Sequence, residues 1–230
     1  MTEHHLEIVE GDPRDYRALA HLHYREARPA TLCRVLTARH RDQTVGVLVV
    51  SRPTLNARWR NLLWPGQYAG ADKRANAARL NADLRCISRV IVDPRARGLG
   101  VGTSLVRAYL NAPLTRRTEA VAAMGAACGI FRAAEMREIL LPPSPRDRTL
   151  RLALRRAGIA PWELLDPSRI ADRARTIEHA LRRWANDARA TRARALAPLH
   201  ELIERAARAV ASPSAPRAYG HDSDHPARKD

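Results

Sequence analysis

The stretch that decides the fold is residues 85–110, RCISRVIVDPRARGLGVGTSLVRAYL. Its first part, residues 86–92, is apolar and β-branched, which predicts a strand that the following Asp-Pro pair ends. Three glycines, Gly98, Gly100 and Gly102, then lead into an apolar helix. Glycines let backbone N–H groups come close to a ligand, and the N-terminus of a helix attracts anions. The pattern therefore predicts a pyrophosphate-binding strand–loop–helix unit.

Two other nucleotide-binding loops do not fit this spacing. A Rossmann loop needs G-x-G-x-x-G and an acidic residue about 20 residues further on. Here the spacing is G-x-G-x-G, and the acidic residue near that distance, Glu119, falls in the next predicted strand. A P-loop needs a lysine after its last glycine, and no lysine follows these glycines. The alternative to a pyrophosphate-binding loop is an ordinary glycine-rich turn between a strand and a helix.

The segment resembles motif A of the GNAT superfamily of N-acetyltransferases, R/Q-x-x-G-x-G/A after a strand that ends near Asp-Pro. The stretch from Arg97 to Gly102 fits this motif, and the same pattern also fits two residues earlier, from Arg95. The resemblance covers residues 4–141 and implies an α/β (α+β) fold with a mixed, mostly antiparallel sheet flanked by helices. The expected strands are residues 6–10, 31–38, 44–51, 86–92, 118–124 and 137–141, with helices at 13–25, after the glycine loop and at 126–135.

The resemblance also implies where acetyl-CoA, or another acyl-CoA, would bind as co-substrate. The backbone of the strand before the loop would carry the pantetheine arm, so that Val90, Ile91 and Val92 contact it. The thioester would lie between this strand and residues 118–124, where an amine acceptor attacks it directly. The residues implied to hold the pyrophosphate are Arg95, Arg97, Gly98, Leu99, Gly100, Val101, Gly102 and Thr103.

The candidate catalytic residues are Glu119, His23 and Tyr24. Glu119 is the carboxylate best placed to act as general base; its alternative is an outward-facing residue paired with Arg116 or Arg117. His23 and Tyr24 end the first predicted helix, which in this fold borders the acceptor site. An imidazole has a pKa near the working pH, but a solvated helix terminus explains the same residues equally well.

At one position the chain departs from the pattern of the superfamily. Many members carry a tyrosine in the helix after the fifth strand, and it protonates the leaving thiolate. Phe131 occupies that position and cannot donate a proton. Cys128, nearby, is predicted to be a small buried side chain rather than a nucleophile. The sequence therefore names no general acid.

An insert of residues 52–84 separates the third and fourth expected strands, and it is long for a loop in a compact domain. Its Trp59 and Trp64 either stack on a nucleobase or another flat acceptor, or anchor the insert to the sheet. Together with residues 23–25 and 53–56, the insert weakly resembles a phage and prokaryotic branch near the Mom-type DNA-modification proteins. That resemblance implies a base in DNA as the acceptor.

The composition is strongly basic, with 40 Lys and Arg against 24 Asp and Glu and a formal net charge of +16. The net charge is +9 over residues 1–145, +8 over 146–217 and −1 over 218–230. Such a charge suits contact with a polyanion. Because it is spread over the chain, it predicts no single binding stripe.

Beyond residue 141 the sequence predicts a different organisation. Residues 142–145, PPSP, form a linker into a helical extension over residues 142–211, with one helix at 147–157 and a longer one from residue 166. The apolar stripe of the longer helix predicts packing on the catalytic domain (residues 1–141) or on a second subunit of a homodimer. Residues 212–230 are rich in Pro, Ser and charge, and are expected to be a disordered tail.

The sequence has no signal-peptide character and no apolar run of about 18 residues. A soluble cytoplasmic protein without a membrane partner is therefore expected, and scattered cysteines fit a reducing compartment. No metal-ligand spacing is present. The preferred function is an N-acyltransferase that uses acetyl-CoA. The alternatives are an enzyme of this fold that modifies a nucleic-acid base, and a non-catalytic nucleic-acid-binding or protein-binding module.

Overall fold

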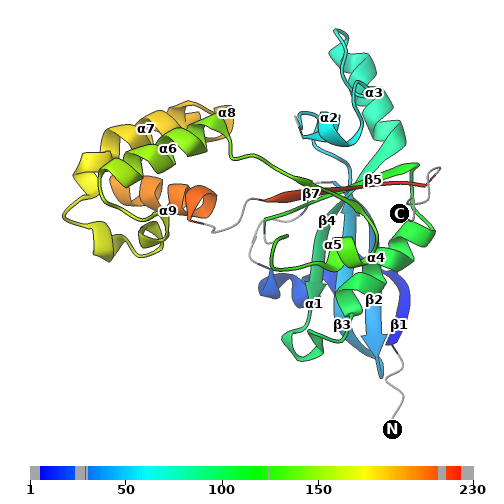
Figure 1. Ribbon diagram of the computed structural model, residues 1–230. Coiled ribbons are helices and arrows are strands. Elements are labelled where there is room, and N and C mark those ends of the chain that lie inside the picture. The colour runs from blue at the N-terminus through cyan, green and yellow to red at the C-terminus, as the bar shows by residue number, and fades with distance from the viewer. Residues whose placement is uncertain are drawn as a thin grey trace. The chain divides into compact units, whose positions relative to one another are not determined.

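The computed structural model describes residues 6–23, 29, 31–57, 59–123, 125–211 and 216–223 (Figure 1). The chain forms two compact units. Unit 1 comprises residues 1–141 and 216–230, and unit 2 comprises residues 142–215. Each unit has a hydrophobic core of its own.

Unit 1 is built on one sheet of seven strands in the order β1-β2-β3-β4-β5-β7-β6. Only β4 and β5 are parallel; all other neighbours are antiparallel. The predicted fold class, a mixed and mostly antiparallel sheet flanked by helices, is confirmed. The strands are β1 (Leu6–Gly11), β2 (Leu32–His40), β3 (Gln43–Ser51), β4 (Leu84–Val92), β5 (Arg117–Ala122), β6 (Arg137–Leu140) and β7 (Arg217–Asp222).

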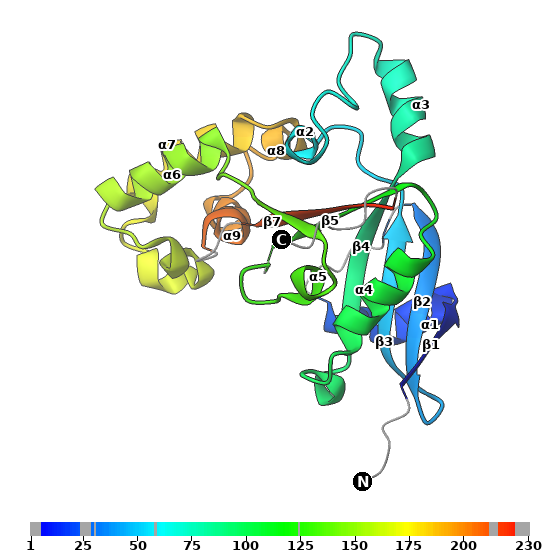
Figure 2. The same cartoon turned by 45° about the vertical axis from the view of Figure 1, so that its right-hand side comes forward.

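Helices cover both faces of this sheet (Figure 2). On one face, Leu105 and Tyr109 of α4 pack on Leu48 of β3 and Ile87 of β4. On the other face, α1 buries Tyr16 and Leu19 against β3. The helices of unit 1 are α1 (Pro13–Leu19), η1 (Ala20–Leu22), α2 (Arg60–Leu63), α3 (Lys73–Asp83), η2 (Pro94–Ala96), α4 (Val101–Asn111) and α5 (Ile130–Ala133).

Two helices are shorter than the sequence predicts. The helix expected over 13–25 ends at Leu19 and continues only as the 3₁₀ turn of η1. The helix expected over 126–135 is reduced to Ile130–Ala133, because Gly129 precedes it and Glu135 adopts a left-handed conformation with φ 62° directly after it. The predicted insert also contains a full helix, α3, which Asp72 caps at its start.

The expectation of a disordered tail is wrong for residues 217–222, which form β7. This strand lies between β5 and β6; it pairs with β5 along its whole length and with β6 from Arg217 to Gly220. Its central residues, Ala218, Tyr219 and Gly220, are buried, so the pairing and burial outweigh the polar composition of the segment. Residues 212–215 and 224–230 of the predicted tail lie outside the described residues.

The strand β7 also changes how the helical part of the chain is attached. Leu140 of β6 is paired with Arg217 of β7, and the Leu141 N–H donates to Pro216 O at 3.2 Å. The chain therefore leaves the sheet at residue 141 and returns beside the same point at residue 216. Unit 2 occupies the place of the turn in a β-hairpin, so it is an insertion and not the expected C-terminal extension.

Unit 2 is a small helical bundle. Its apolar stripe, which includes Ile177, Leu181 and Trp184, is buried in the core of the unit itself. The long helix expected from residue 166 is broken into 3₁₀ turns before α7, and Pro167 begins the first of them. The elements are α6 (Pro145–Arg156), η3 (Pro161–Leu165), η4 (Pro167–Ile170), η5 (Ala174–Ile177), α7 (Glu178–Asn186), α8 (Arg189–Arg192) and α9 (Leu199–Val210). Within the described ranges, no helix is both long and apolar enough to span a lipid bilayer.

Candidate functional site

The parallel strands β4 and β5 separate part-way along their length. They pair from Leu84 with Arg117 to Ile87 with Ala120, and no further pairs follow among the described residues. Beyond this point β4 continues to Val92 along β3, whereas β5 continues along β7 (Figure 2). A strand edge without a neighbouring strand offers its N–H and C=O groups to an extended ligand. The separation therefore leaves an unpaired strand edge in the middle of the sheet.

A β-bulge marks the residue at which β4 leaves β5. Val50 of β3 is paired with Ile87 and Val49 with Arg89, so Ser88 is the extra residue on β4. A bulge interrupts the hydrogen-bond ladder and changes the direction of the strand. The Ser88 hydroxyl lies 2.8 Å from the Ser51 hydroxyl and donates to Val49 O at 3.1 Å.

The glycine loop follows β4 and opens onto the N-terminus of α4. Gly98 and Gly100 have φ values of 81° and 78°, a conformation that glycine adopts without strain. No heavy atom lies within 4 Å of the position that a Cβ would take at either residue, so the space beside the loop is open. The first bond of α4 runs from Ser104 N–H to Gly100 O at 3.0 Å. The N–H groups of Val101, Gly102 and Thr103 precede it and have no acceptor within the helix.

The two loop arginines differ in the charge that they can offer. Arg95 pairs with Asp93 at 2.9 Å and donates to it from both backbone and side chain. These Arg95 bonds lower the pKa of Asp93 to about 2, so the carboxylate stays ionised and offsets the charge of Arg95. Arg97 is exposed and forms no ion pair with any described residue. Of the two, Arg97 is therefore the cation available to an anionic ligand; Leu99 is also exposed there.

Val90, Ile91 and Val92, which are predicted to contact pantetheine, do not all point to the same face of the sheet. A Cβ at Gly102 would lie 3.7 Å from Val90 Cγ1, 3.6 Å from Val92 Cγ2 and 3.2 Å from Ile130 Cγ2. Glycine at this position thus lets α4 approach the free part of β4. Ile91 is buried on the opposite face, against the α1 side of the sheet. Any contact of Ile91 with a ligand in the separation would be through its backbone.

Glu119 lies on β5, next to Cys86 of β4 in the register. Its carboxylate accepts from Arg60 through two bonds, Nε to Oε2 and Nη2 to Oε1, both at 2.8 Å. The side chains of Glu119 and Arg60 are 1% and 3% exposed, so the expected alternative of a pair with Arg116 or Arg117 is wrong. Burial raises the pKa of Glu119, and the guanidinium opposes this rise. Because the Glu119 side chain is 1% exposed, an amine can reach it only if the residues that cover it move; its role as general base stays a prediction.

Arg60 is the site residue that the sequence analysis missed. Besides Glu119, its Nη2 donates to Thr54 O at 2.8 Å and its Nη1 to Leu55 O at 3.4 Å. Its guanidinium lies 5.5 Å from the centre of the Trp59 ring. One arginine among so many gives no local signal. Its place in the fold shows that it ties the loop after β3 to β5.

Trp64 anchors the insert to the sheet. Trp64 is buried and packs with Leu63, Leu80 and Leu84. A Cβ at Gly220 of β7 would lie 2.7 Å from Leu63 Cδ2 and 3.2 Å from Trp64 Cζ2, so α2 sits directly on the sheet. This burial favours the anchoring interpretation of Trp64 over a stacking platform. Trp59 is only half-buried.

Phe131 is a core residue. It is buried, and its ring centre lies 4.9 Å from that of Tyr219. The Tyr219 hydroxyl donates to Glu138 Oε1 at 2.9 Å, and burial raises the Tyr219 pKa to about 12. Cys128 is exposed, so the expectation of a small buried side chain is wrong. It belongs to the irregular segment before α5, which leaves its side chain outside the core.

The first helix contributes to a pocket beside the glycine loop. The pocket is lined by His21 and Leu22, which follow α1, and by Gln43, Asp93 and Arg95. Its volume is about 660 Å³. His23 is half-buried, next to this segment, whereas the predicted Tyr24 lies outside the described residues. In the part of the chain that the structure describes, no three His, Cys, Asp or Glu side chains gather closely enough to hold a metal ion.

Comparisons with known proteins add little to this geometry. No protein-family model matches the chain, and no curated protein matches it. Among solved structures, a mutant agmatine N-acetyltransferase in its apo form is similar, with a TM-score of 0.36 and 11% sequence identity. The match covers 59% of this chain and 84% of that chain. Values this low carry no argument about activity, so the functional assignment depends on the site itself.

Proposed function

We propose that unit 1 is an N-acyltransferase that takes an acyl-CoA, with acetyl-CoA as the first choice, and transfers the acyl group to an amine. The observation that supports this most is the direct succession of two binding features. The free edge of β4 ends at Val92, and the glycine loop with the N-terminus of α4 follows at once. A ligand with an amide-bearing arm joined to a diphosphate matches both features in this order.

Each part of the site has a role in binding the donor. The backbone of β4 between Ser88 and Val92 would hydrogen-bond the amides of the pantetheine arm, as a neighbouring strand does. The N–H groups of Val101, Gly102 and Thr103 would bind the diphosphate, which the helix dipole favours. Arg97 would add an exposed cation that forms no ion pair with any described carboxylate.

In the transfer, the amine nitrogen forms a bond to the thioester carbonyl carbon, the carbon–sulfur bond breaks, and the thiolate takes a proton. The backbone at the Ser88 bulge lies outside the regular ladder, so its N–H is a candidate donor to the negative oxygen that develops. Phe131 cannot supply the proton. Water is the simplest donor to the thiolate, and water or a residue at the acceptor side takes the proton from the amine.

The net charge of +16 favours a second, related candidate. A strongly positive protein repels a free ammonium ion and attracts anions. An amine carried by an anionic molecule, including a nucleic-acid base, is therefore preferred over a free polyamine as acceptor. Binding that weakens steeply with salt would support a nucleic-acid acceptor; a salt-insensitive response would remove it.

Calorimetry with acetyl-CoA tests the donor site directly. Thr103→Asp places a carboxylate at the third residue of α4, where acids stabilise a helix, so the fold is kept while the anion site is blocked. Ala75→Asp adds the same charge at the third residue of α3 and is the matched control. We expect wild type and A75D to bind and T103D to bind at least tenfold more weakly. A folded wild-type protein that does not bind acetyl-CoA would refute the proposal.

A further inference from the structure

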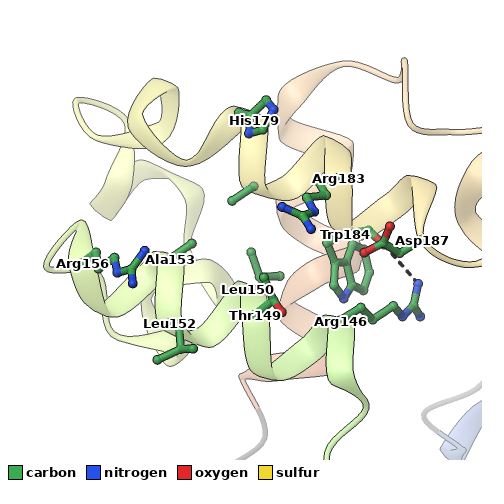
Figure 3. Close-up of a pocket in the computed structure, with 11 residues that line it drawn as sticks. Arg146, Thr149, Leu150, Leu152, Ala153, Arg156, His179, Arg183, Trp184 and Asp187 are labelled. Atoms are coloured by element: carbon green, nitrogen blue, oxygen red, sulfur yellow. Dashed lines mark hydrogen bonds between the residues drawn. The ribbon is translucent and has the colours of Figure 1, made fainter.

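Unit 2 contains a groove between α6 and α7 with a volume of about 390 Å³ (Figure 3). One face of each helix lines the groove, and the proposed acyl transfer in unit 1 does not use it. On α6 the lining residues recur at helical spacing, from Arg146 through Thr149 and Ala153 to Arg156. The remaining lining residues are Leu150, Leu152, His179, Ala180, Arg183, Trp184 and Asp187.

The floor of this groove is apolar. Leu150 and Trp184 are 1% and 3% exposed and belong to the core of the unit. The Trp184 indole donates to Asp147 Oδ1 at 2.7 Å, and the Arg146 guanidinium lies 4.6 Å from the centre of its ring. Leu152, which also lines the groove, is 51% exposed, so the groove offers apolar surface to a partner. Its described lining holds no exposed aromatic ring on which a base could stack.

The rim of the groove carries an excess of positive charge. Arg156 and Arg183 are exposed, and neither forms an ion pair with any described residue. Arg146 is held at one end by bonds to Trp184 O at 3.3 Å and to Thr191 Oγ1 at 3.0 Å. Asp187 is the one carboxylate in the lining. Cations that no protein carboxylate neutralises attract an anionic partner.

We propose that the groove docks an acidic segment of a partner protein, with an apolar side chain on the floor and carboxylates at Arg156 and Arg183. The apolar floor gives a phosphodiester backbone nothing to bind, which favours a peptide over a nucleic acid. A second copy of this chain, also at +16, would be repelled. The wall of the groove on α6, from Arg146 to Arg156, is roughly 15 Å long. An extended segment of about five residues covers that distance.

The probe is a fluorescein-labelled peptide, GEELLEEG, and its partner GEESSEEG has the same charge without apolar side chains. Binding to the full chain is measured by fluorescence anisotropy in buffer of about 0.15 M salt, where distant charges are screened. Arg156→Glu/Arg183→Glu reverses the rim. Arg148→Glu/Arg155→Glu makes the same charge change at exposed residues of α6 that do not line the groove. Ala153→Phe fills the floor and leaves the charge unchanged.

We expect GEELLEEG to bind, the rim variant and A153F to weaken it at least tenfold, and the control variant to weaken it less than threefold. GEESSEEG should bind at least tenfold more weakly than the leucine peptide. Equal binding of both peptides, equal loss in the rim and control variants, or no binding by the folded wild type would each overturn the proposal. It would also be overturned if a 20-nucleotide single strand bound more tightly, lost affinity in the rim variant and was unaffected by A153F. Acetyl-CoA binding, read separately, is unaffected by these outcomes.

Discussion

The buried pair of Glu119 and Arg60 gives the sharpest test of the site. Glu119→Gln keeps the size of the side chain and removes its charge. The Arg60 guanidinium then remains 3% exposed without its counter-charge, and one of its two 2.8 Å bonds meets an amide N–H₂ group. Removing one partner of a buried pair costs about 3–5 kcal/mol. At about 2–4 °C per kcal/mol for a domain of this size, the Tm of unit 1 should fall by roughly 6–20 °C.

Replacing both partners should be less harmful than the two single changes together. Arg60→Met/Glu119→Leu removes both charges and leaves apolar side chains in the same space. The Thr54 and Leu55 carbonyls still lose their donor, which costs about 1–3 kcal/mol. We therefore expect the double variant to be more stable than the sum of the single changes Arg60→Met and Glu119→Leu predicts. Scanning calorimetry measures the transition, and hydrogen exchange of the β5 amides assigns it to unit 1.

Glu178→Gln is the matched control. Glu178 pairs with Arg182 one helical turn away on α7, with about a third of each side chain exposed. The same chemical change there should cost no more than about 1 kcal/mol. If E119Q proved as mild as this control, the argument from burial would be refuted. If E119Q were also stable but inactive in acyl transfer, that result would support Glu119 as the general base.

Three further results are expected. Replacing residues 142–215 with Asn-Gly should leave unit 1 folded, because this dipeptide closes a β-hairpin. Deleting residues 216–230 should instead abolish the cooperative unfolding transition of unit 1, as measured by circular dichroism. Phe131→Ala should lower the free energy of unfolding by about 3–5 kcal/mol in urea, since the ring lies against Tyr219; a loss below about 1 kcal/mol would contradict its place in the core. Burial lowers the pKa of His221, so the unfolded state binds its proton more readily. Stability should fall as the pH drops below about 6.5 until the folded imidazole is protonated, and His221→Asn should reduce this slope between pH 7.5 and 5.5.

The sequence was sufficient for the strands whose signal is local. Residues 44–51 and 86–92 are β-branched and apolar. After the second of these strands, Gly98 and Gly100 have positive φ values where the chain turns into α4. Each of these features is decided by residues close together in the sequence. Hydrophobic pattern and turn residues are therefore enough to predict them.

The features that the sequence did not reveal depend on partners far away. Arg60 and Glu119 are separated by 59 residues, and nothing in either segment signals that the two meet. The strand β7 is a short polar segment whose pairing with β5 and β6 supplies most of its stability. The Ser88 bulge is visible only in the register with β3. Propensity is a weak guide wherever long-range contacts decide the structure.

The position of unit 2 between β6 and β7 also sets an order of events during synthesis. When β6 has left the ribosome, the strand that belongs between it and β5 has not yet been made. Residues 142–215 must be translated first, which takes roughly 4–15 s at about 5–20 residues per second. Throughout this interval two strand edges of the incomplete sheet are open to other nascent chains. Those edges are therefore exposed until β7 emerges, and slower translation of the insertion would lengthen the exposure.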